Sequence, residues 1–184
     1  WDRLVGECPM SELEAAGEAV GLKSGKAGNS EAGHMNIGAG RMVLQDDVRL
    51  DLALKNGAFD RNEVFLAAID GAKQRGKGLH LLALLSEKSS HGTLDYPLAL
   101  LRLAKARGLA EVYLHLIFDG RSTEPGSAPA LLERLEQRLD TLGIGRIVTG
   151  MGRGLALDRD GDYAKTRRAY DALVFGRGTP AQPG

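Results

Sequence analysis

The chain has 184 residues, 43% of them hydrophobic, and its 24 basic residues balance 24 acidic ones. This length suits one ordinary domain, or a domain with an appendage, and the hydrophobic content is enough for a core. A net charge of zero provides no long-range field, which argues against nucleic acid and anionic lipid as partners.

The sequence also argues against a membrane location. No apolar run approaches the roughly 18 to 20 residues that a transmembrane helix needs, and the N-terminus lacks the pattern of a secretory signal. Cys8 is the single cysteine, so an intrachain disulfide cannot form, and we expect a reducing, cytoplasmic compartment. Because the chain begins with Trp1 rather than methionine, we also expect it to be a fragment.

The first informative segment is dense in glycine and contains one serine, in the run Gly28-Asn29-Ser30-Glu31-Ala32-Gly33-His34. It predicts a loop whose main-chain N–H groups face an anion, and therefore a phosphate site. The spacing fits neither a P-loop nor the elbow of an α/β-hydrolase. A plain turn is the alternative that the glycines alone leave open.

Alternating helix and strand patterns follow this segment. Residues 62–74 have apolar side chains at helical spacing, and residues 79–85 form a near-continuous apolar run that is typical of a buried parallel strand. A second helix is predicted over residues 94–107, because Gly108 is a good C-terminal signal.

The second half of the chain repeats this alternation. A strand is predicted over 112–118, a helix from Pro129 through the leucines up to 142, a short strand over 145–150 and a helix over 162–174. After the first helix the order is βαβαβα. The sequence therefore predicts an α/β fold with a parallel sheet flanked by helices and right-handed crossovers.

Polar residues follow each of the three predicted strands. His91, Arg121 and Arg153 all come shortly after a strand, and ligands of open α/β sheets bind beyond the carboxyl ends of the strands. A histidine and two arginines suit a ligand with a carboxylate and a phosphate, because arginine makes bidentate contacts. For each arginine taken singly, a surface salt bridge is the alternative.

The remaining histidines have more ordinary interpretations. His80 and His115 lie inside apolar strand sequence and are predicted to be core residues with satisfied hydrogen bonds. His34 is predicted to organise the serine loop.

Several motifs together resemble cofactor-independent phosphoglycerate mutase. Besides the serine run, they are residues 17–22, 35–41, 78–86, 119–121, 152–153, 158–160 and 170–174, so the resemblance covers essentially the whole chain. It implies interconversion of 3-phosphoglycerate and 2-phosphoglycerate in glycolysis through a phosphoserine intermediate, without 2,3-bisphosphoglycerate as a cofactor.

The resemblance also assigns roles to particular residues. It makes Ser30 the catalytic phosphoryl acceptor and a ligand of a two-manganese site. The substrate-binding positions that it implies are His91, Arg121, Ser122, Arg153 and Arg159.

The same resemblance predicts how the chain is divided. Residues 1–44 would belong to an alkaline-phosphatase-like domain that carries the nucleophile, residues 45–175 to an inserted phosphotransferase-type α/β domain, and residues 176–184 to a mobile linker or tail. The rest of the phosphatase-like domain, with most metal ligands, would lie outside this chain. We therefore expect the isolated chain to be inactive, and the complete protein to be a monomer.

Three positions depart from the family pattern. Ser122 stands where the family has an aspartate, the turn at residues 86–91 lacks two glycines and gains Lys88, and Gly154-Leu155 replace an aromatic pair. These changes leave a second hypothesis open, in which the chain is a stand-alone module that binds a phosphorylated ligand, or a degenerate pseudoenzyme.

Overall fold

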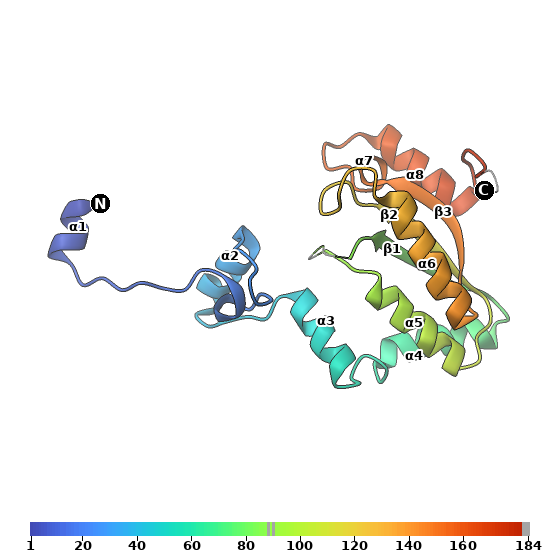
Figure 1. The fold of residues 1–184 in the computed structure, drawn as a ribbon, viewed down its shortest axis with the longest axis horizontal. Helices are drawn as coiled ribbons and strands as arrows, with labels where there is room; N and C mark the ends of the chain where they lie inside the picture. Colours follow the sequence, from blue (N-terminus) through green and yellow to red (C-terminus); the bar gives the residue numbers. More distant parts are fainter. Residues whose placement is uncertain (88, 90, 182–184) are drawn as a thin grey trace. The chain divides into compact units, whose positions relative to one another are not determined.

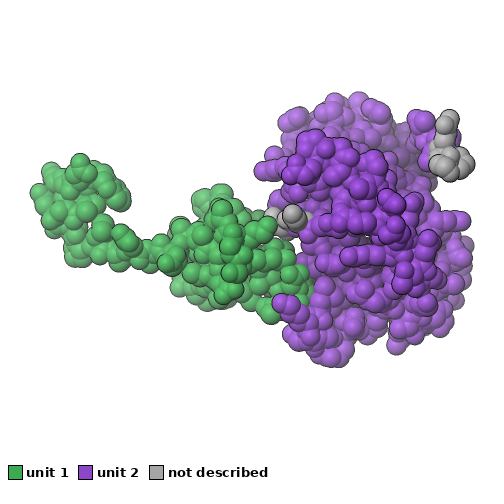
Figure 2. Space-filling model, in the orientation of Figure 1, with its two compact units in different colours: residues 1–53 green, residues 54–184 purple. Residues whose placement is uncertain are grey.

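The computed structural model describes residues 1–87, 89 and 91–181 (Figure 1). The chain separates into two compact units, residues 1–53 and 54–184 (Figure 2). Within the described residues, no helix is both long enough and apolar enough to cross a membrane.

Short helices form the first unit. They are α1 (Asp2–Glu7), the 3-10 helix η1 (Gly17–Val20), α2 (Ser30–Ala39) and most of α3 (Asp46–Lys55). The side chain of Asn36 connects three of the segments, because its Nδ2 donates to the Val20 carbonyl at 3.0 Å and its Oδ1 accepts from the Val43 N–H at 2.6 Å. Asn36 therefore fixes α2 against η1 and against the segment that leads into α3.

The prediction of a loop around Ser30 is wrong, because helix α2 begins at Ser30 and continues to Ala39. Asn29 caps the helix by accepting the Ala32 N–H at 2.8 Å, and Gly33 lies within it. A glycine inside a helix costs about 1 kcal/mol relative to alanine. The cap and the Asn36 contacts favour the helix in spite of that cost.

A three-stranded parallel sheet and five helices make up the rest of the described chain. In order, the elements are α4 (Glu63–Gln74), β1 (Leu79–Leu85), α5 (Asp95–Ala106), β2 (Val112–Phe118), α6 (Ala128–Leu142), β3 (Arg146–Gly152), α7 (Arg153–Ala156) and α8 (Tyr163–Phe175). The strand order is β1-β2-β3, with both pairs parallel. The predicted α/β class is confirmed, although the helices α1, η1, α3 and α7 were not predicted.

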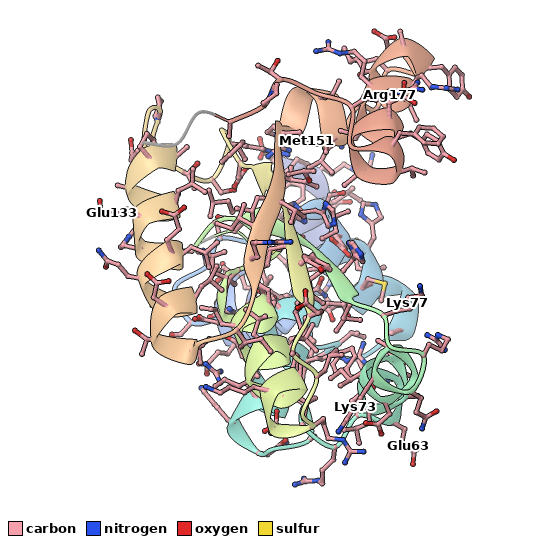
Figure 3. All side chains as sticks on the ribbon, turned by 90° about the vertical axis from the view of Figure 1, so that its right-hand side faces the viewer. Glu63, Lys73, Lys77, Glu133, Met151 and Arg177 are labelled. Carbon is pink, nitrogen blue, oxygen red and sulfur yellow. The ribbon has the colours of Figure 1, made fainter. Side chains whose placement is uncertain are left out.

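The core lies on one face of this sheet. Leu85, Leu114 and Leu116 point to that face and are almost completely buried, together with Leu101 of α5 and Leu135 of α6. Helices α5 and α6 lie against the sheet, and Glu133 of α6 points away from it (Figures 1 and 3). The amphipathic helices thus bury their leucines against the apolar strands, which is the main stabilising contribution in such a fold.

Strand β3 contains one irregularity. Leu114 pairs with Ile147, but the next residue of β2, His115, pairs with Thr149, so Val148 is an extra residue in β3. Such a bulge bends the strand and increases its twist. Ile147 packs against the core, whereas Thr149 faces His115 on the opposite face of the sheet.

Candidate functional site

The carboxyl ends of the strands border a cavity of about 640 Å³. Four of the six predicted site residues line it, namely His91, Arg121, Arg153 and Arg159. Its remaining lining includes apolar side chains of β1 and β2, such as Leu82, Leu84 and Ile117. Residues that are far apart in the sequence thus meet at one edge of the sheet, where a parallel sheet places its ligands.

Ser122 is the predicted substrate residue that the structure places elsewhere. It lines a second cavity, of about 170 Å³, together with Glu87 and Arg134. The guanidinium of Arg134 pairs with the Glu87 carboxylate at 3.1 Å. The structure therefore groups Ser122 with this ion pair and not with His91 and the three arginines.

Asp119 organises the larger cavity, although sequence reasoning did not single it out. Its buried carboxylate accepts hydrogen bonds from the backbone N–H groups of Arg121 (3.1 Å) and Ser122 (3.2 Å). It also accepts from the Arg153 guanidinium at 2.5 Å. The sequence signal was available, because Asp119 is the first polar residue after the apolar run of β2.

The same contacts keep Asp119 charged. Burial by itself would raise the pKa of this carboxyl, but hydrogen bonds from the Arg121 N–H, the Arg153 guanidinium and the Ser122 N–H outweigh burial, so the net pKa is lowered. A charged Asp119 neutralises Arg153 and fixes the backbone on which Arg121 stands.

The arginines of the larger cavity differ in their partners. Within the described residues, no carboxylate lies within ion-pair distance of Arg121 or Arg159, whereas Arg153 is paired. Arg121 and Arg159 are therefore the guanidinium groups free to bind an anion, and His91 adds a third polar group to the lining. The backbone N–H of His91 donates to Ser89 Oγ at 3.1 Å. Residues 88 and 90 of the predicted turn lie outside the described residues.

A second ion pair fixes the segment that carries Arg159. The carboxylate of Asp158 accepts from Lys165 Nζ of α8 at 2.9 Å and from the Asp162 N–H at 2.9 Å. The hydrogen bond from Lys165 is the largest cause of the lowered pKa of Asp158, and the same bond raises the pKa of Lys165. Asp158 lines the cavity, but its charge is compensated.

Ser30 lies in the first unit, exposed at the beginning of α2. Its Oγ is 3.2 Å from Nδ1 of His34, and the same nitrogen is 2.7 Å from the Ser30 carbonyl oxygen. The N-terminus of a helix carries a partial positive charge that favours a bound anion. Across the parts of the chain that the structure describes, no group of three or more His, Cys, Asp or Glu side chains could hold a metal ion. The described residues therefore do not form a metal site by themselves.

Two histidines form a hydrogen-bonded row across the sheet. His80 Nδ1 lies 2.8 Å from His115 Nε2, and His115 Nδ1 lies 2.8 Å from Thr149 Oγ1. His115 is buried with both ring nitrogens bonded, as predicted. The prediction is wrong for the burial of His80, which is exposed near the beginning of the edge strand β1.

Comparison with known proteins places this geometry in context. Residues 50–183 match the family model described as "BPG-independent PGAM N-terminus". The 2,3-bisphosphoglycerate-independent phosphoglycerate mutase of Myxococcus xanthus (strain DK1622) is 49% identical over 180 residues, which is 98% of this chain and 35% of the relative. The protein of the same name from Moorella thermoacetica is 47% identical over 179 residues, 97% of this chain and 35% of the relative.

A solved structure agrees with these matches. A crystal structure of Leishmania mexicana phosphoglycerate mutase at low cobalt concentration superposes with a TM-score of 0.80 and 31% sequence identity, covering 90% of this chain and 31% of that protein. This chain therefore spans about a third of the length of the relatives that it matches.

Proposed function

This chain belongs to the family of 2,3-bisphosphoglycerate-independent phosphoglycerate mutases, and from that premise we propose that it supplies the phosphotransferase part of such an isomerase together with the nucleophile segment. The proposed reaction is the interconversion of 3-phosphoglycerate and 2-phosphoglycerate in glycolysis. The observation that carries this proposal is the cavity lined by His91, Arg121, Arg153 and Arg159.

The chemistry of the cavity matches the proposed substrate. Phosphoglycerate carries a phosphate and a carboxylate, and planar guanidinium groups bind both through paired hydrogen bonds. Arg121 and Arg159 are available for these contacts. In the proposal, Arg153 contributes a further N–H while Asp119 holds it in place, and His91 hydrogen-bonds a substrate oxygen.

Ser30 is the proposed phosphoryl acceptor. A bond from Ser30 Oγ to phosphorus forms as the bond from phosphorus to the glycerate oxygen breaks, and the hydroxyl proton of the serine ends on the released glycerate hydroxyl. The glycerate then turns in the cavity and takes the phosphoryl group back on its other hydroxyl, which restores Ser30. The reaction consumes nothing, so it needs no 2,3-bisphosphoglycerate.

Two Mn²⁺ ions and a further domain complete the proposal. A bound metal lowers the pKa of a serine hydroxyl and neutralises phosphate charge. Because the described residues do not form a metal site, we assign most ligands to a phosphatase-like domain outside this chain, to which residues 1–44 would also belong, with Ser30 as a ligand from within it. The complete enzyme is proposed to be a cytoplasmic monomer.

A chimaeric enzyme tests this function. This chain replaces the matching segment of the Myxococcus xanthus relative, and phosphoserine is detected by mass spectrometry after incubation with 3-phosphoglycerate. Ser30→Ala should abolish both turnover and phosphoserine, whereas the control Ser24→Ala, at another exposed serine of the same segment, should leave both unchanged. Normal turnover in the Ser30→Ala chimaera would contradict the proposed function.

The hypothesis of a stand-alone binding module is not favoured by the matches to complete mutases. Ser122, in place of an aspartate, is one of the three departures that motivated it. Because Ser122 lines a different cavity from His91 and the three arginines, this substitution leaves those residues in place.

A further inference from the structure

Ser30 and His34 form a hydrogen-bonded unit on the first turn of α2. Residues four apart lie on the same side of a helix, so the imidazole of His34 folds back over Ser30. Its Nδ1 lies 2.7 Å from the Ser30 carbonyl oxygen and 3.2 Å from Ser30 Oγ. One ring nitrogen thus faces two oxygen atoms of the same serine.

The shorter contact decides which nitrogen of His34 carries the proton. A carbonyl oxygen only accepts hydrogen bonds, so a nitrogen 2.7 Å away must donate. In the neutral imidazole the proton therefore sits on Nδ1. Ser30 Oγ, at the longer distance, becomes the second acceptor of the same N–H, so the hydrogen bond has three centres.

This tautomer limits what His34 can do to Ser30. A nitrogen that already carries a proton cannot accept one, so Nδ1 cannot remove the hydroxyl proton of Ser30 as the histidine of a Ser-His-Asp triad does. Instead, the N–H fixes the direction of Oγ. It also supplies a donor whose hydrogen bond strengthens as negative charge develops on that oxygen.

We propose that His34 is a positioning residue that holds Ser30 Oγ through its Nδ1–H and does not act as the base. The tautomer and the contact follow from the geometry of α2, whereas the consequence for catalysis rests on the proposed function, in which Ser30 accepts the phosphoryl group. His34 is exposed, so its substitution is expected to leave the fold intact.

Long-range proton–nitrogen NMR of the 184-residue chain tests the tautomer without any activity. At a pH where the imidazole is neutral, His34 should show the pattern of a proton on Nδ1. The pattern should persist in Ser30→Ala, because the carbonyl acceptor remains. A proton on Nε2 in the unsubstituted chain would overturn the proposal.

Two matched variants in the Myxococcus chimaera test the catalytic consequence. In His34→Asn the new side-chain amide nitrogen would lie near the position of Nδ1. In His34→Gln it would lie near the position of Nε2. We expect His34→Ala and His34→Gln to lower kcat about tenfold to a hundredfold with little change in KM, and His34→Asn to recover most of the loss.

The outcomes separate the two proposals. Equal kcat values for the Ala, Gln and Asn variants, with Ser30→Ala inactive, would overturn the role of His34 and leave the proposed function standing. Normal turnover in Ser30→Ala would overturn the proposed function, while the NMR experiment would still decide the tautomer. If the unsubstituted chimaera is itself inactive, the NMR result decides alone.

Discussion

The guanidinium of Arg153 donates to the carboxylate of Asp119 across 2.5 Å, and thereby joins the end of β2 to the beginning of α7. Asp119 also accepts the N–H groups of Arg121 and Ser122. One buried carboxylate thus sets the positions of two arginines of the larger cavity. The arrangement of the larger cavity therefore depends on the Asp119 carboxylate, whose oxygens are already occupied by these hydrogen bonds.

Asp119→Asn should therefore affect both stability and the cavity. An amide carries no charge and presents one acceptor where the carboxylate presents two, so we expect a loss of about 1 to 3 kcal/mol in the free energy of unfolding. Urea denaturation measures this loss. Ser122→Ala is the control, because it keeps the N–H that Asp119 accepts, and a loss of equal size there would contradict the role of Asp119.

Arg121 and Arg159 should carry most of the anion affinity. The isolated chain is expected to bind 3-phosphoglycerate weakly, and Arg121→Gln or Arg159→Gln should weaken that binding about tenfold, as expected for a lost charge-assisted contact. Chemical-shift titration by NMR measures the affinities. Arg138→Gln is the matched control, because this arginine of α6 pairs with Asp95 at 3.5 Å and does not line the cavity. Equal losses at all three positions would indicate nonspecific attraction.

Ser122→Asp should leave the affinity for 3-phosphoglycerate unchanged, both in the isolated chain and in the Myxococcus chimaera. The new carboxylate would enter the cavity of Glu87 and Arg134, which is not the cavity of Arg121 and Arg159. Calorimetric titration of both proteins measures the affinity, with Ser127→Asp in the same cavity as control. A clear gain in affinity in Ser122→Asp alone would contradict the assignment of Ser122 to the second cavity.

The stability of the fold should decline on mild acidification because of His115. Burial is the largest cause of its lowered pKa, and the nearby His80 adds to it. A histidine whose pKa is lower in the folded than in the unfolded state contributes full stability above its unfolded pKa of about 6.5, and that contribution is lost as the pH falls below it.

Urea unfolding at a series of pH values around that point checks this dependence. His115→Gln removes the titrating group and should therefore remove its part of the slope of the unfolding free energy against pH. His34→Gln, at an exposed position, should retain that slope. An unchanged slope in His115→Gln would contradict the assignment.

The strands could be predicted from the sequence because the first two are continuous apolar runs. Such a run also indicates a strand covered on both faces, which is wrong for β1, since Leu82 is exposed on the face opposite the core. Residues 79–85 and 112–118 form strands with the bounds that their apolar runs predict. The first unit could not be predicted in this way. Helix α2 depends on the Asn29 cap and on the Asn36 contacts, which are tertiary features that a glycine-rich pattern conceals.

The candidate site shows the same division. His91, Arg121 and Arg153 each follow a predicted strand, and this placement indicated that the three residues would meet at one edge of the sheet. In the structure they line one cavity. The sequence could not predict that Ser122 would line another cavity, because adjacent residues of a loop can point in different directions. The roles of the site residues in binding and catalysis stay predictions.

The extra residue in β3 means that this strand can lose one residue and keep its pairing with β2. A one-residue deletion in a strand normally moves every later side chain to the wrong face. Here, deletion of Val148 would leave Ile147 opposite Leu114 and Thr149 opposite His115, so every other pairing would be preserved. We expect that deletion to fold with the His115–Thr149 contact intact and a straighter strand. Deletion of Ile147 should also fold, because Val148 would take its place opposite Leu114, with a small loss of stability from the smaller side chain. Within β3, the bulge at residues 147–148 is therefore where the strand can lose a residue.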